Sequence, residues 1–371
     1  MEYRTAKSDE RDDFMDLAHL AFGFNLEKLI PKVYDVTQDP SAYHKVAVDE
    51  RGRIRSQIAV LPETHVVAGQ TLRVGFVGLV STHPRNRGEG HMKTLMDLQL
   101  AEGQKRYDLM ALYGQRQRYE HFGFTQGGIR LKYFVETANV RHALSGVDSA
   151  EIAFTPFSET PDADRFAFTL NQKRLASVVR SQGDISKILV GFGQKAWGIL
   201  AQGRLIGYLT TNTGGDEITE IGLSYAVDLS RFIKAYMEFF QKPSISILMP
   251  DYEISLNETL LGFSEVTRTE SADMYYIVDF ANVLNAYLSL KLAATGLSNG
   301  VFSAVLEGQP VTATVDASGV SVVRSALPNA VRLDRKQAQI LLLSNYGKFL
   351  KVAVPEGWFP LPLFWYYADR F

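Results

Sequence analysis

The spacing of apolar and polar residues changes several times along the chain, and each change predicts a different kind of element. Residues 9–22 carry apolar side chains at helical intervals behind Asp9, which predicts a helix with an N-terminal cap. From residue 45 onward, apolar residues alternate with polar ones around turn residues, which predicts two hairpins. Residues 74–80 are apolar on both faces, so we expect a central strand there.

The residues that follow complete a first mixed α/β domain. We expect helices over 88–106 and 117–122 and strands over 109–113 and 130–136. The turn-rich stretch after them places a domain boundary at residue 140. Residues 150–275 repeat the same order of elements more weakly, which indicates an internal structural repeat. A third domain begins near residue 280 with a helix, alternating strands and a second helix.

The C-terminal stretch, residues 358–371, is rich in aromatic and apolar residues up to its last position, Phe371. Chain ends are usually polar and frayed. We therefore expect this end of the chain to be packed against the rest of the protein.

Composition narrows the class of protein. The chain has 371 residues, 46% of them hydrophobic and 22% charged, which is ordinary for a globular protein of two or three domains. Its net charge of -2 provides no basic excess, so nucleic-acid binding is disfavoured. Cysteine is absent, which excludes disulfides, thiolate metal sites and a cysteine nucleophile.

The sequence shows no sign of a membrane or metal partner. Its N-terminal stretch is charged, and no apolar run approaches the roughly 20 residues of a membrane span. We therefore expect a cytoplasmic protein without a membrane partner. The histidines show no metal-ligand spacing, so we expect no metal.

The strongest chemical signal is a glycine-rich turn between the central strand and the next helix. It reads Arg85-Asn86-Arg87-Gly88-Glu89-Gly90. Glycines let successive N–H groups and the helix N-terminus point at one anion, and the arginines add charge at the rim. The turn therefore predicts a pyrophosphate site, with a ligand-free turn as the alternative. A P-loop lysine is missing, and the glycine spacing is wrong for a dinucleotide-binding fold.

A second signal, Tyr119-Glu120-His121-Phe122-Gly123-Phe124, follows the next buried strand. Ligands of open α/β sheets lie beyond the carboxyl ends of the strands, so we expect Tyr119 to face a bound ligand. A tyrosine with a pKa of about 10 can donate a proton to a departing thiolate. The alternative is a packed aromatic residue. We expect Glu120 to face solvent and His83, beside the turn, to make a local hydrogen bond.

Together these motifs resemble the GNAT superfamily of acetyl-CoA-dependent N-acetyltransferases. The resemblance is closer to the enhanced intracellular survival (Eis) family, whose members read T-H-x-R-x-R-G and then Y-x-x-F-G-[FY]. Here those patterns are Thr82-His83, Arg85, Arg87-Gly88 and Tyr119, Phe122-Gly123-Phe124. The resemblance implies an α/β (α+β) fold: two tandem GNAT-like domains with mixed sheets, over 1–140 and 141–279, followed by a sterol-carrier-protein-like α/β domain over 280–371.

The same resemblance implies which residues contact acetyl-CoA. Where the central strand splays, its backbone would contact the co-substrate; the glycine-rich turn would hold the pyrophosphate; and the end of the following strand would meet the pantetheine or acetyl group. These residues are Gly78, Leu79 and Val80; Arg85, Asn86, Arg87, Gly88, Glu89, Gly90 and His91; and Gly114 and Gln115.

The resemblance also implies an unusual general base. In this family it is the free α-carboxylate of the C-terminal residue, inserted into the N-terminal domain, and this chain ends in Phe371. Tyr119 would be the general acid toward the CoA thiolate. A terminal carboxylate has a pKa of about 3.3–3.7 and is a poor base in water, but burial among aromatic residues raises it. The alternative is a C-terminal segment that only packs within its own domain.

The acceptor pocket is less well marked. We expect its walls to include Phe22, Phe24, Tyr34 and Phe76, with Asp369 facing inward. Arg370 departs from the family pattern, because members that acetylate aminoglycosides line this pocket with acidic groups. A cation beside the terminal carboxylate would oppose such a substrate unless it points away.

We therefore predict an N-acetyltransferase that transfers acetyl directly from acetyl-CoA to the primary amine of a small polyamine or aminoglycoside-like acceptor. Direct transfer follows because no cysteine can carry the acetyl group. A protein lysine is the second class of acceptor. Two further alternatives are a protein that holds a lipid or other apolar ligand beside a vestigial acetyltransferase domain, and a regulatory scaffold. The resemblance also implies a homo-oligomer, a hexamer.

Overall fold

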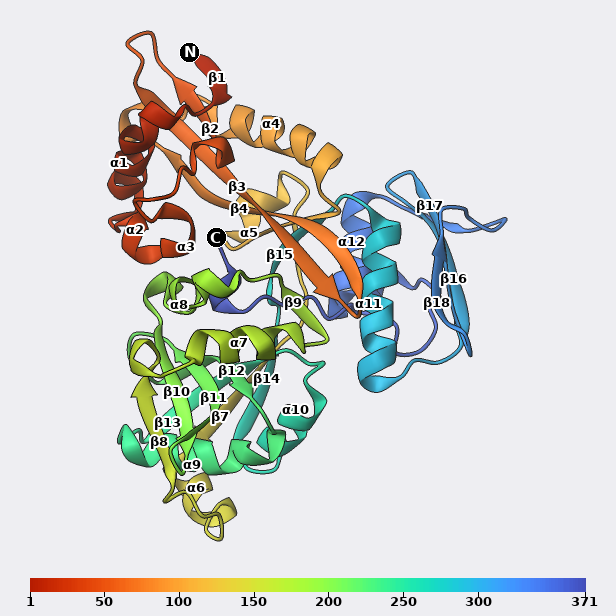
Figure 1. The fold of residues 1–371 in the computed structure, drawn as a ribbon. Helices are drawn as coiled ribbons and strands as arrows, with labels where there is room; N and C mark the ends of the chain where they lie inside the picture. The colour runs from red at the N-terminus through yellow and green to blue at the C-terminus, as the bar shows by residue number, and fades with distance from the viewer. The chain divides into compact units, whose positions relative to one another are not determined.

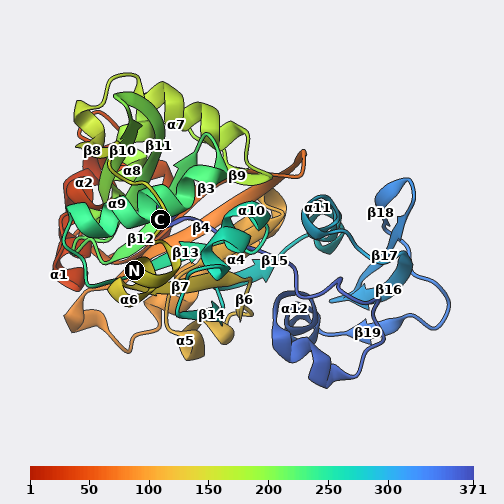
Figure 2. The ribbon, with the colours of Figure 1, turned by 90° about the horizontal axis from the view of Figure 1, so that it is seen from below.

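The computed structural model describes residues 1–371, and packing divides the chain into two compact units (Figures 1 and 2). The first unit contains Met1–Gly128, Asp273–Leu363 and Phe371. The second unit contains Ile129–Ala272 and Phe364–Arg370.

The main sheet of the first unit is mixed. Its strands are β1 (Glu2–Thr5), β2 (His44–Val48), β3 (Ile54–Val67), β4 (Gln70–Thr82), β5 (Leu109–Leu112), β6 (Thr125–Gly127) and β15 (Asp273–Ile277). They are ordered β1-β2-β3-β4-β5-β15-β6. Only β4 and β5 run parallel; the other neighbours are antiparallel.

Helices cover both faces of this sheet, which is why β4 is apolar on both sides. They are α1 (Arg11–Phe22), α2 (Leu26–Leu29), α3 (Pro31–Tyr34), α4 (His91–Arg106) and α5 (Arg116–Glu120). On one face, Leu95 and Met96 of α4 pack against Val77 of β4. Phe76, the neighbouring residue on the strand, points to the opposite face, where α1 contacts β3 and β4.

The first unit also contains a smaller sheet (Figure 1, blue). Its elements are α11 (Phe280–Thr295), β16 (Gly300–Leu306), β17 (Gln309–Asp316), β18 (Gly319–Val323), β19 (Val331–Leu333) and α12 (Arg335–Leu343). The strands are ordered β18-β17-β16-β19. α11 packs on this sheet and also contacts β3 and β4, while α12 contacts β6. The small sheet and the main sheet therefore share one packed unit.

The second unit has its own mixed sheet, ordered β14-β7-β13-β12-β11-β10-β8, in which only β12 and β13 are parallel. The strands of this sheet are β7 (Arg130–Glu136), β8 (Ile152–Pro156), β10 (Lys195–Ala201), β11 (Arg204–Thr211), β12 (Glu217–Leu223), β13 (Ser244–Met249) and β14 (Val266–Glu270). A further short strand of the unit, β9 (Ala176–Val178), lies outside this sheet. The helices of the unit are α6 (Thr137–Ala143), α7 (Ala163–Gln172), α8 (Ile185–Leu189), α9 (Leu229–Phe239) and α10 (Ile254–Leu261).

Two hydrophobic cores, one on each face, hold the second sheet in place. Leu209 of β11 packs with Phe232 and Ile233 of α9. The preceding residue, Tyr208, packs on the other face with Ala167 of α7 and the residues of α8. Alternation along the strand thus sends successive side chains into different cores.

The predicted α/β class with several mixed sheets is confirmed. Residues 130–136 form the expected strand, but β7 pairs with β13 and β14 of the second sheet, and β15 fills the place between β5 and β6 in the first. The domain bounds 1–140, 141–279 and 280–371 stay a prediction, as does the sterol-carrier-like character of the last. None of the helices combines the length and apolar character needed to cross a bilayer.

Candidate active site

The site begins where β4 separates from β5. Their parallel pairing ends at Val77 and Leu112, while β4 continues to Thr82. The last residues of β4 therefore have no partner in β5. This gap lies at the carboxyl ends of two parallel strands, where open α/β sheets bind their ligands.

On the other side of β4, a β-bulge interrupts its pairing with β3. Gly78 pairs with Ala59 of β3 and Ser81 pairs with Gln57, so β4 carries one residue more than its partner. Leu79, inside the bulge, has a φ of 51°, in the left-handed region. A bulge leaves backbone groups outside the ladder. Leu79 and Val80, two of the predicted acetyl-CoA contacts, thus lie where the regular pairing of the strand is interrupted.

The glycine-rich turn has the conformation that its sequence predicts. A 3₁₀ turn over Pro84–Asn86 leads into Gly88 and Gly90, with φ of 83° and 82°. His83 makes the expected local hydrogen bond, because its Nδ1 accepts from the N–H of Arg85 at 3.2 Å. Gly90 caps α4 without a side chain, so no side chain covers the N–H groups of the first helical turn.

A cavity of about 650 Å³ lies over this turn. Its lining comes from the ends of α1 and β4, the turn itself, the start of α4 and one residue of α5: Ala21, Phe22, Val80, Ser81, Thr82, Asn86, Arg87, Gly88, Gly90, His91, Met92, Lys93 and Arg118. The lining includes three permanent cations and no carboxylate. The cavity therefore suits an anion.

The structure separates the residues of the predicted pyrophosphate turn into two groups. Most line the cavity, but Arg85 and Glu89 do not. The Glu89 carboxylate accepts hydrogen bonds from Asn86 Nδ2 at 3.2 Å and lies 3.0 Å from Nε2 of His91. The hydrogen bond from the Asn86 amide lowers the pKa of Glu89. The negative charge of Glu89 is thus bound by Asn86 and His91 beside it. His91 is also held from its other nitrogen, 2.9 Å from the Tyr3 hydroxyl.

Two cations of the cavity were not predicted from the sequence. Lys93 lies in the first turn of α4, and Arg118 directly precedes Tyr119 on α5. A basic residue soon after a glycine-rich helix start is a signal that could have pointed to Lys93. Arg118 carries no such local signal, because only the fold brings α5 beside the turn.

The terminal residue lies against β4. Phe371 is 8% exposed, and a Cβ built on Gly78 would lie 3.1 Å from its carboxyl carbon and 3.0 Å from its oxygen. The nearest atom of Phe371, its ring Cδ1, would lie 2.8 Å from that Cβ, so a side chain at position 78 would displace the Phe371 ring and crowd the terminal carboxyl group. Val77 faces the α4 core. The next residue, Gly78, faces the opposite side of the sheet, so Phe371, which packs against Gly78, lies on that opposite side.

Tyr34 packs against Phe371. The two rings are stacked, with centroids 6.1 Å apart and planes 13° apart. Tyr34 is fully buried, and its hydroxyl lies 2.8 Å from His44 Nε2. Gln57 donates from Nε2 to the carbonyl of Phe14 at 2.8 Å, which leaves its Oε1 to accept from His44 Nδ1 at 2.9 Å. His44 therefore carries its proton on Nδ1, and its Nε2 accepts from Tyr34.

Burial of two histidines predicts a loss of stability in mild acid. Burial lowers the pKa of His44 to about 4 and that of His65 to about 3, from an ordinary 6.5. The unfolded chain then binds more protons than the folded one below about pH 6.5. Each histidine should cost about 2 kcal/mol of unfolding free energy between pH 7 and pH 5, measured by urea denaturation. His44→Gln should flatten this dependence, whereas the exposed His142→Gln should not; equal slopes for both variants would contradict the prediction.

Tyr119 lies in a short helix with its ring in the α4 core. It is 7% exposed and meets Phe124 edge-on, at 6.4 Å between centroids. Burial raises its pKa, so the hydroxyl stays protonated at neutral pH, as a general acid requires. A Cβ on Gly114 would collide with the Tyr119 ring, so this glycine makes room for the tyrosine. Gln115 caps α5, and its carbonyl accepts the N–H of Tyr119 at 3.3 Å.

The other expected aromatic residues lie in different environments. Phe22 lines the anion-binding cavity and is stacked with Phe24, at 5.1 Å between centroids. Phe76 is fully buried and has no surface for an acceptor. Glu120, which we expected to face solvent, forms an ion pair with Arg116 at 2.9 Å. Of the predicted acceptor walls, Phe22 is the one that lines the cavity over the glycine-rich turn.

The expectation that Asp369 faces an acceptor is wrong. Its carboxylate is buried in the second unit and accepts two hydrogen bonds from Arg180, at 2.7 and 2.9 Å. Arg180 also donates two bonds to Glu220 on β12, both at 2.8 Å, and Glu220 is bound further by Arg174 and Tyr208. Burial opposes the charge of Glu220, but the two guanidinium groups outweigh it and hold its pKa below the usual range. Asp369 thus fixes residues 364–370 within the second unit and does not face an acceptor.

Arg370 is also engaged within the second unit. Its guanidinium lies over the Tyr367 ring, 4.1 Å from the centroid, and donates to the carbonyl of Ala272 at 3.3 Å. Its side chain is 96% buried, since only 4% is exposed. The cation next to the terminal carboxylate in the sequence is therefore bound by its own contacts.

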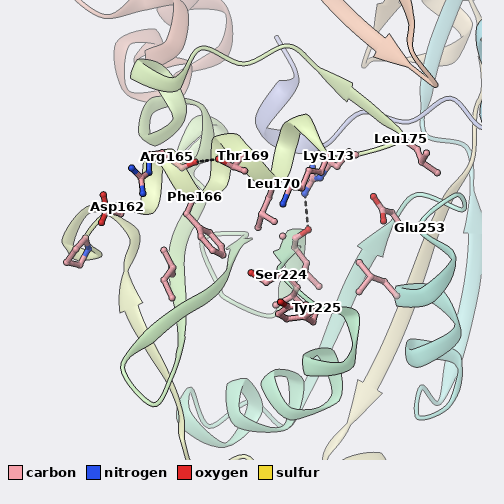
Figure 3. Close-up of a pocket in the computed structure, with 17 residues that line it drawn as sticks. Asp162, Arg165, Phe166, Thr169, Leu170, Lys173, Leu175, Ser224, Tyr225 and Glu253 are labelled. Atoms are coloured by element: carbon pink, nitrogen blue, oxygen red, sulfur yellow. Dashed lines mark hydrogen bonds between the residues drawn. The ribbon is translucent and has the colours of Figure 1, made fainter.

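The second unit has a cavity in the corresponding position of its own sheet (Figure 3). β12 and β13 pair only at Glu217–Ser246 and Ile218–Ile247, and the cavity, about 780 Å³, lies along the released end of β12. Figure 3 shows Phe166 and Leu170 of α7 above Ser224 and Tyr225, which follow β12. The predicted internal repeat thus extends from the order of elements to the position of a cavity.

The chemistry of this second cavity differs from that of the first. The chain after β12 reads Ser224-Tyr225-Ala226-Val227-Asp228, without glycine. Asp228 occupies the cap of α9 and pairs with Arg231 at 3.2 Å. A carboxylate at a helix N-terminus occupies the place that would favour a phosphate. Only the first unit therefore has the features of a diphosphate site.

Comparison with known families assigns the N-terminal part of the chain. Residues 2–127 match the sequence profile of the acetyltransferase (GNAT) domain. This range contains the bulged strand, the glycine-rich turn, the cavity lining and Tyr119. No curated protein sequence matches the chain. The acetyltransferase class predicted from the motifs is confirmed by the profile.

Solved structures share the fold over nearly the whole chain. A probable N-acyltransferase from Enterococcus faecalis V583 is 15% identical with a TM-score of 0.69, covering 96% of this chain and 93% of that one. A GCN5-related N-acetyltransferase from Anabaena variabilis ATCC 29413 is 14% identical with a TM-score of 0.65, covering 92% and 89%. Eis1 from Mycobacterium abscessus is 12% identical with a TM-score of 0.64, and each chain is covered completely. Residues 2–127 therefore match an acetyltransferase domain of the GNAT type, and the whole chain shares the fold of Eis1.

Proposed function

We propose that this acetyltransferase uses acetyl-CoA and transfers the acetyl group directly to a primary amine of a small polyamine or aminoglycoside-like acceptor. The observation that carries the proposal is the carboxyl group of Phe371, seated against Gly78 at the point where β4 leaves β5. A carboxylate there is a base without any other evident task in the first unit.

The cavity over the glycine-rich turn fits the diphosphate of the co-substrate. Gly88 and Gly90 have left-handed backbone that leaves room for close approach, and α4 begins without a capping side chain. Arg87, Lys93 and Arg118 supply positive charge. These residues would hold the diphosphate, and the bound co-substrate supplies an acetyl group activated as a thioester.

Three groups of this chain then divide the work of transfer. The Phe371 carboxylate accepts the proton of the acceptor ammonium, which frees the nitrogen lone pair for attack on the acetyl carbonyl. A backbone N–H near Val80, released by the bulge, stabilises negative charge on the carbonyl oxygen. The Tyr119 hydroxyl gives its proton to the departing sulfur. The nitrogen loses two protons: the first goes to the Phe371 carboxylate and on to solvent, and the second, lost as the tetrahedral intermediate collapses to the amide, replaces the proton that Tyr119 gave to the sulfur. The net reaction therefore releases one proton to solvent.

A cationic acceptor suits an anionic base. The terminal carboxylate attracts an ammonium group, and Arg370 is bound by Tyr367 and Ala272. A protein lysine would bring the same ammonium group on a larger substrate. No metal enters the proposal, and no group of three or more His, Asp or Glu side chains is placed to hold one.

An amine panel tests the proposed function. Release of free CoA thiol from acetyl-CoA is followed with spermine, spermidine, kanamycin and a lysine peptide as acceptors. Release with a small polyamine or an aminoglycoside supports the proposal, and release with the peptide alone assigns the lysine class instead. If titration calorimetry detects no binding of acetyl-CoA, the proposed co-substrate is wrong.

Removing a cation from the cavity should weaken acetyl-CoA binding. Arg87→Ala and Lys93→Ala should each raise the KM for acetyl-CoA about tenfold, because a charge-assisted contact to a phosphate is worth about 1.4 kcal/mol or more. Lys105→Ala, in the last turn of the same helix and outside the cavity, is the matched control and should leave this KM unchanged. Equal KM values for Lys93→Ala and Lys105→Ala would place the phosphates elsewhere.

Two further expectations rest on resemblance alone. The resemblance predicts a homo-oligomer, a hexamer, and it predicts a sterol-carrier-like last domain. No step of the transfer described above depends on either.

A further inference from the structure

Two contacts of Phe371 within the first unit, with Gly78 and with Tyr34, differ in kind. Gly78 has no side chain, and this leaves room for the terminal carboxyl group. Tyr34 supplies a surface, since its ring lies nearly parallel to the Phe371 ring. We call these two residues the terminal seat. A free chain end otherwise has few restraints.

Tyr34 itself is held at both ends. Its backbone carbonyl accepts from Arg11 Nη2 at 2.7 Å, and Arg11 is fixed by an ion pair with Glu27 at 3.1 Å. Its hydroxyl donates to His44, which is stacked on Phe14 with centroids 4.1 Å apart. These contacts leave the ring one orientation. The face that Tyr34 presents to Phe371 is therefore fixed by contacts that do not involve Phe371.

We propose that Tyr34, oriented by His44, is a positioning residue that holds the terminal carboxylate over Gly78. The role rests on the proposed function of Phe371 as general base. Tyr34 does not touch the reacting atoms, because its hydroxyl is directed at His44. Its effect on the reaction passes through the Phe371 ring, whose displacement by about 1 Å can cost a hundredfold in rate.

The competing explanation is that Tyr34 is only a core residue whose loss loosens the fold. The chain offers a matched control for this. Tyr287 is also fully buried in the first unit, and its hydroxyl lies 3.2 Å from Nδ1 of the buried His65. Tyr287→Leu therefore removes a similar buried tyrosine–histidine pair, but one with no contact to Phe371.

Two measurements separate position from stability. The first is the rate at which carboxypeptidase A releases Phe371, which reports how often the terminal residue leaves its seat. The second is kcat with acetyl-CoA and spermine, or with whichever amine of the panel reacts faster. Both are made on full-length Tyr34→Leu, Tyr34→Phe and Tyr287→Leu, and the kcat measurement is repeated in chains carrying one extra glycine after Phe371.

We expect Tyr34→Leu to speed release of Phe371 about tenfold or more and to lower kcat by a similar factor. Tyr34→Phe keeps the stacked ring and should stay closer to the native chain, and Tyr287→Leu should change neither rate. In the glycine-extended chain Tyr34→Leu should lower kcat no further, because coupled residues are not additive.

Two results would count against the role of Tyr34. Unchanged release of Phe371 in Tyr34→Leu would overturn it, as would an equal loss of kcat in the native-length and extended chains. A third result bears on the proposed base instead: if the extended chain keeps native kcat, the terminal carboxylate is not the base, and the role proposed for Phe371 fails although acetyl transfer itself is retained. The release rate still decides whether Tyr34 holds the chain end.

Discussion

One glycine added after Phe371 should lower kcat by about a hundredfold to ten-thousandfold, the range measured for loss of a general base, without unfolding the protein. The added residue turns the terminal carboxylate into a neutral amide and places the new carboxylate a residue further along. The seat against Gly78 has no room to accommodate the shift, because a single Cβ at that position would already collide with Phe371. The KM for acetyl-CoA should stay unchanged, since the cations of the cavity are untouched.

Two further variants sharpen this result. Gly78→Ala keeps the free carboxylate but displaces it, so it should lower kcat in the same direction. A glycine added at the exposed N-terminal Met1 is the matched control and should have no effect. Native kcat in the C-terminally extended chain, with the fold confirmed by circular dichroism, would mean that another group removes the proton.

Arg180→Ala should destabilise the second unit by about 3–5 kcal/mol, the cost of breaking a buried ion pair by removing one partner. Arg174, Arg180, Glu220 and Asp369 are all largely buried and balance as two cations and two anions. Without Arg180, the carboxylates of Glu220 and Asp369 are left with one guanidinium in the cluster, that of Arg174. The free energy of unfolding from urea titration, with separate fluorescence and circular dichroism probes, measures the loss.

The control for this prediction is a pair on the surface of the same unit. Arg231 and Asp228 lie 3.2 Å apart, and Arg231 is about a third exposed. Arg231→Ala should cost less than about 1 kcal/mol. If Arg180→Ala and Arg231→Ala shift the unfolding midpoint equally, the buried cluster stabilises the second unit no more than a surface ion pair does.

Local patterns were enough to predict the centre of the site. The apolar run at residues 74–80, the glycines of the turn and the following amphipathic helix are contiguous in the sequence, and each has its expected conformation. Backbone chemistry explains this success, because positive φ at Gly88 and Gly90 and the start of a helix depend on neighbouring residues.

Long-range packing decided what the sequence could not reveal. Nothing near Asp369 shows that Arg180, which is 189 positions away, binds it, so an inward-facing acid was a reasonable but wrong expectation. In the same way, the sequence around Tyr34 predicts only an aromatic wall, whereas in the structure its hydroxyl bonds to His44 and its ring face packs on Phe371. Arg118 reaches the cavity only because β5 lies beside β4.

The pairing of β15 between β5 and β6 has a consequence for anyone who shortens this gene. A fragment that ends at residue 128 contains every residue that matches the acetyltransferase profile, yet it lacks β15 and Phe371. Its strand β5, which reads Leu-Met-Ala-Leu and is buried in the full chain, would become an open apolar edge of the kind that aggregates. A fragment chosen from the profile match alone would therefore lose both the strand that covers β5 and the residue proposed as the general base.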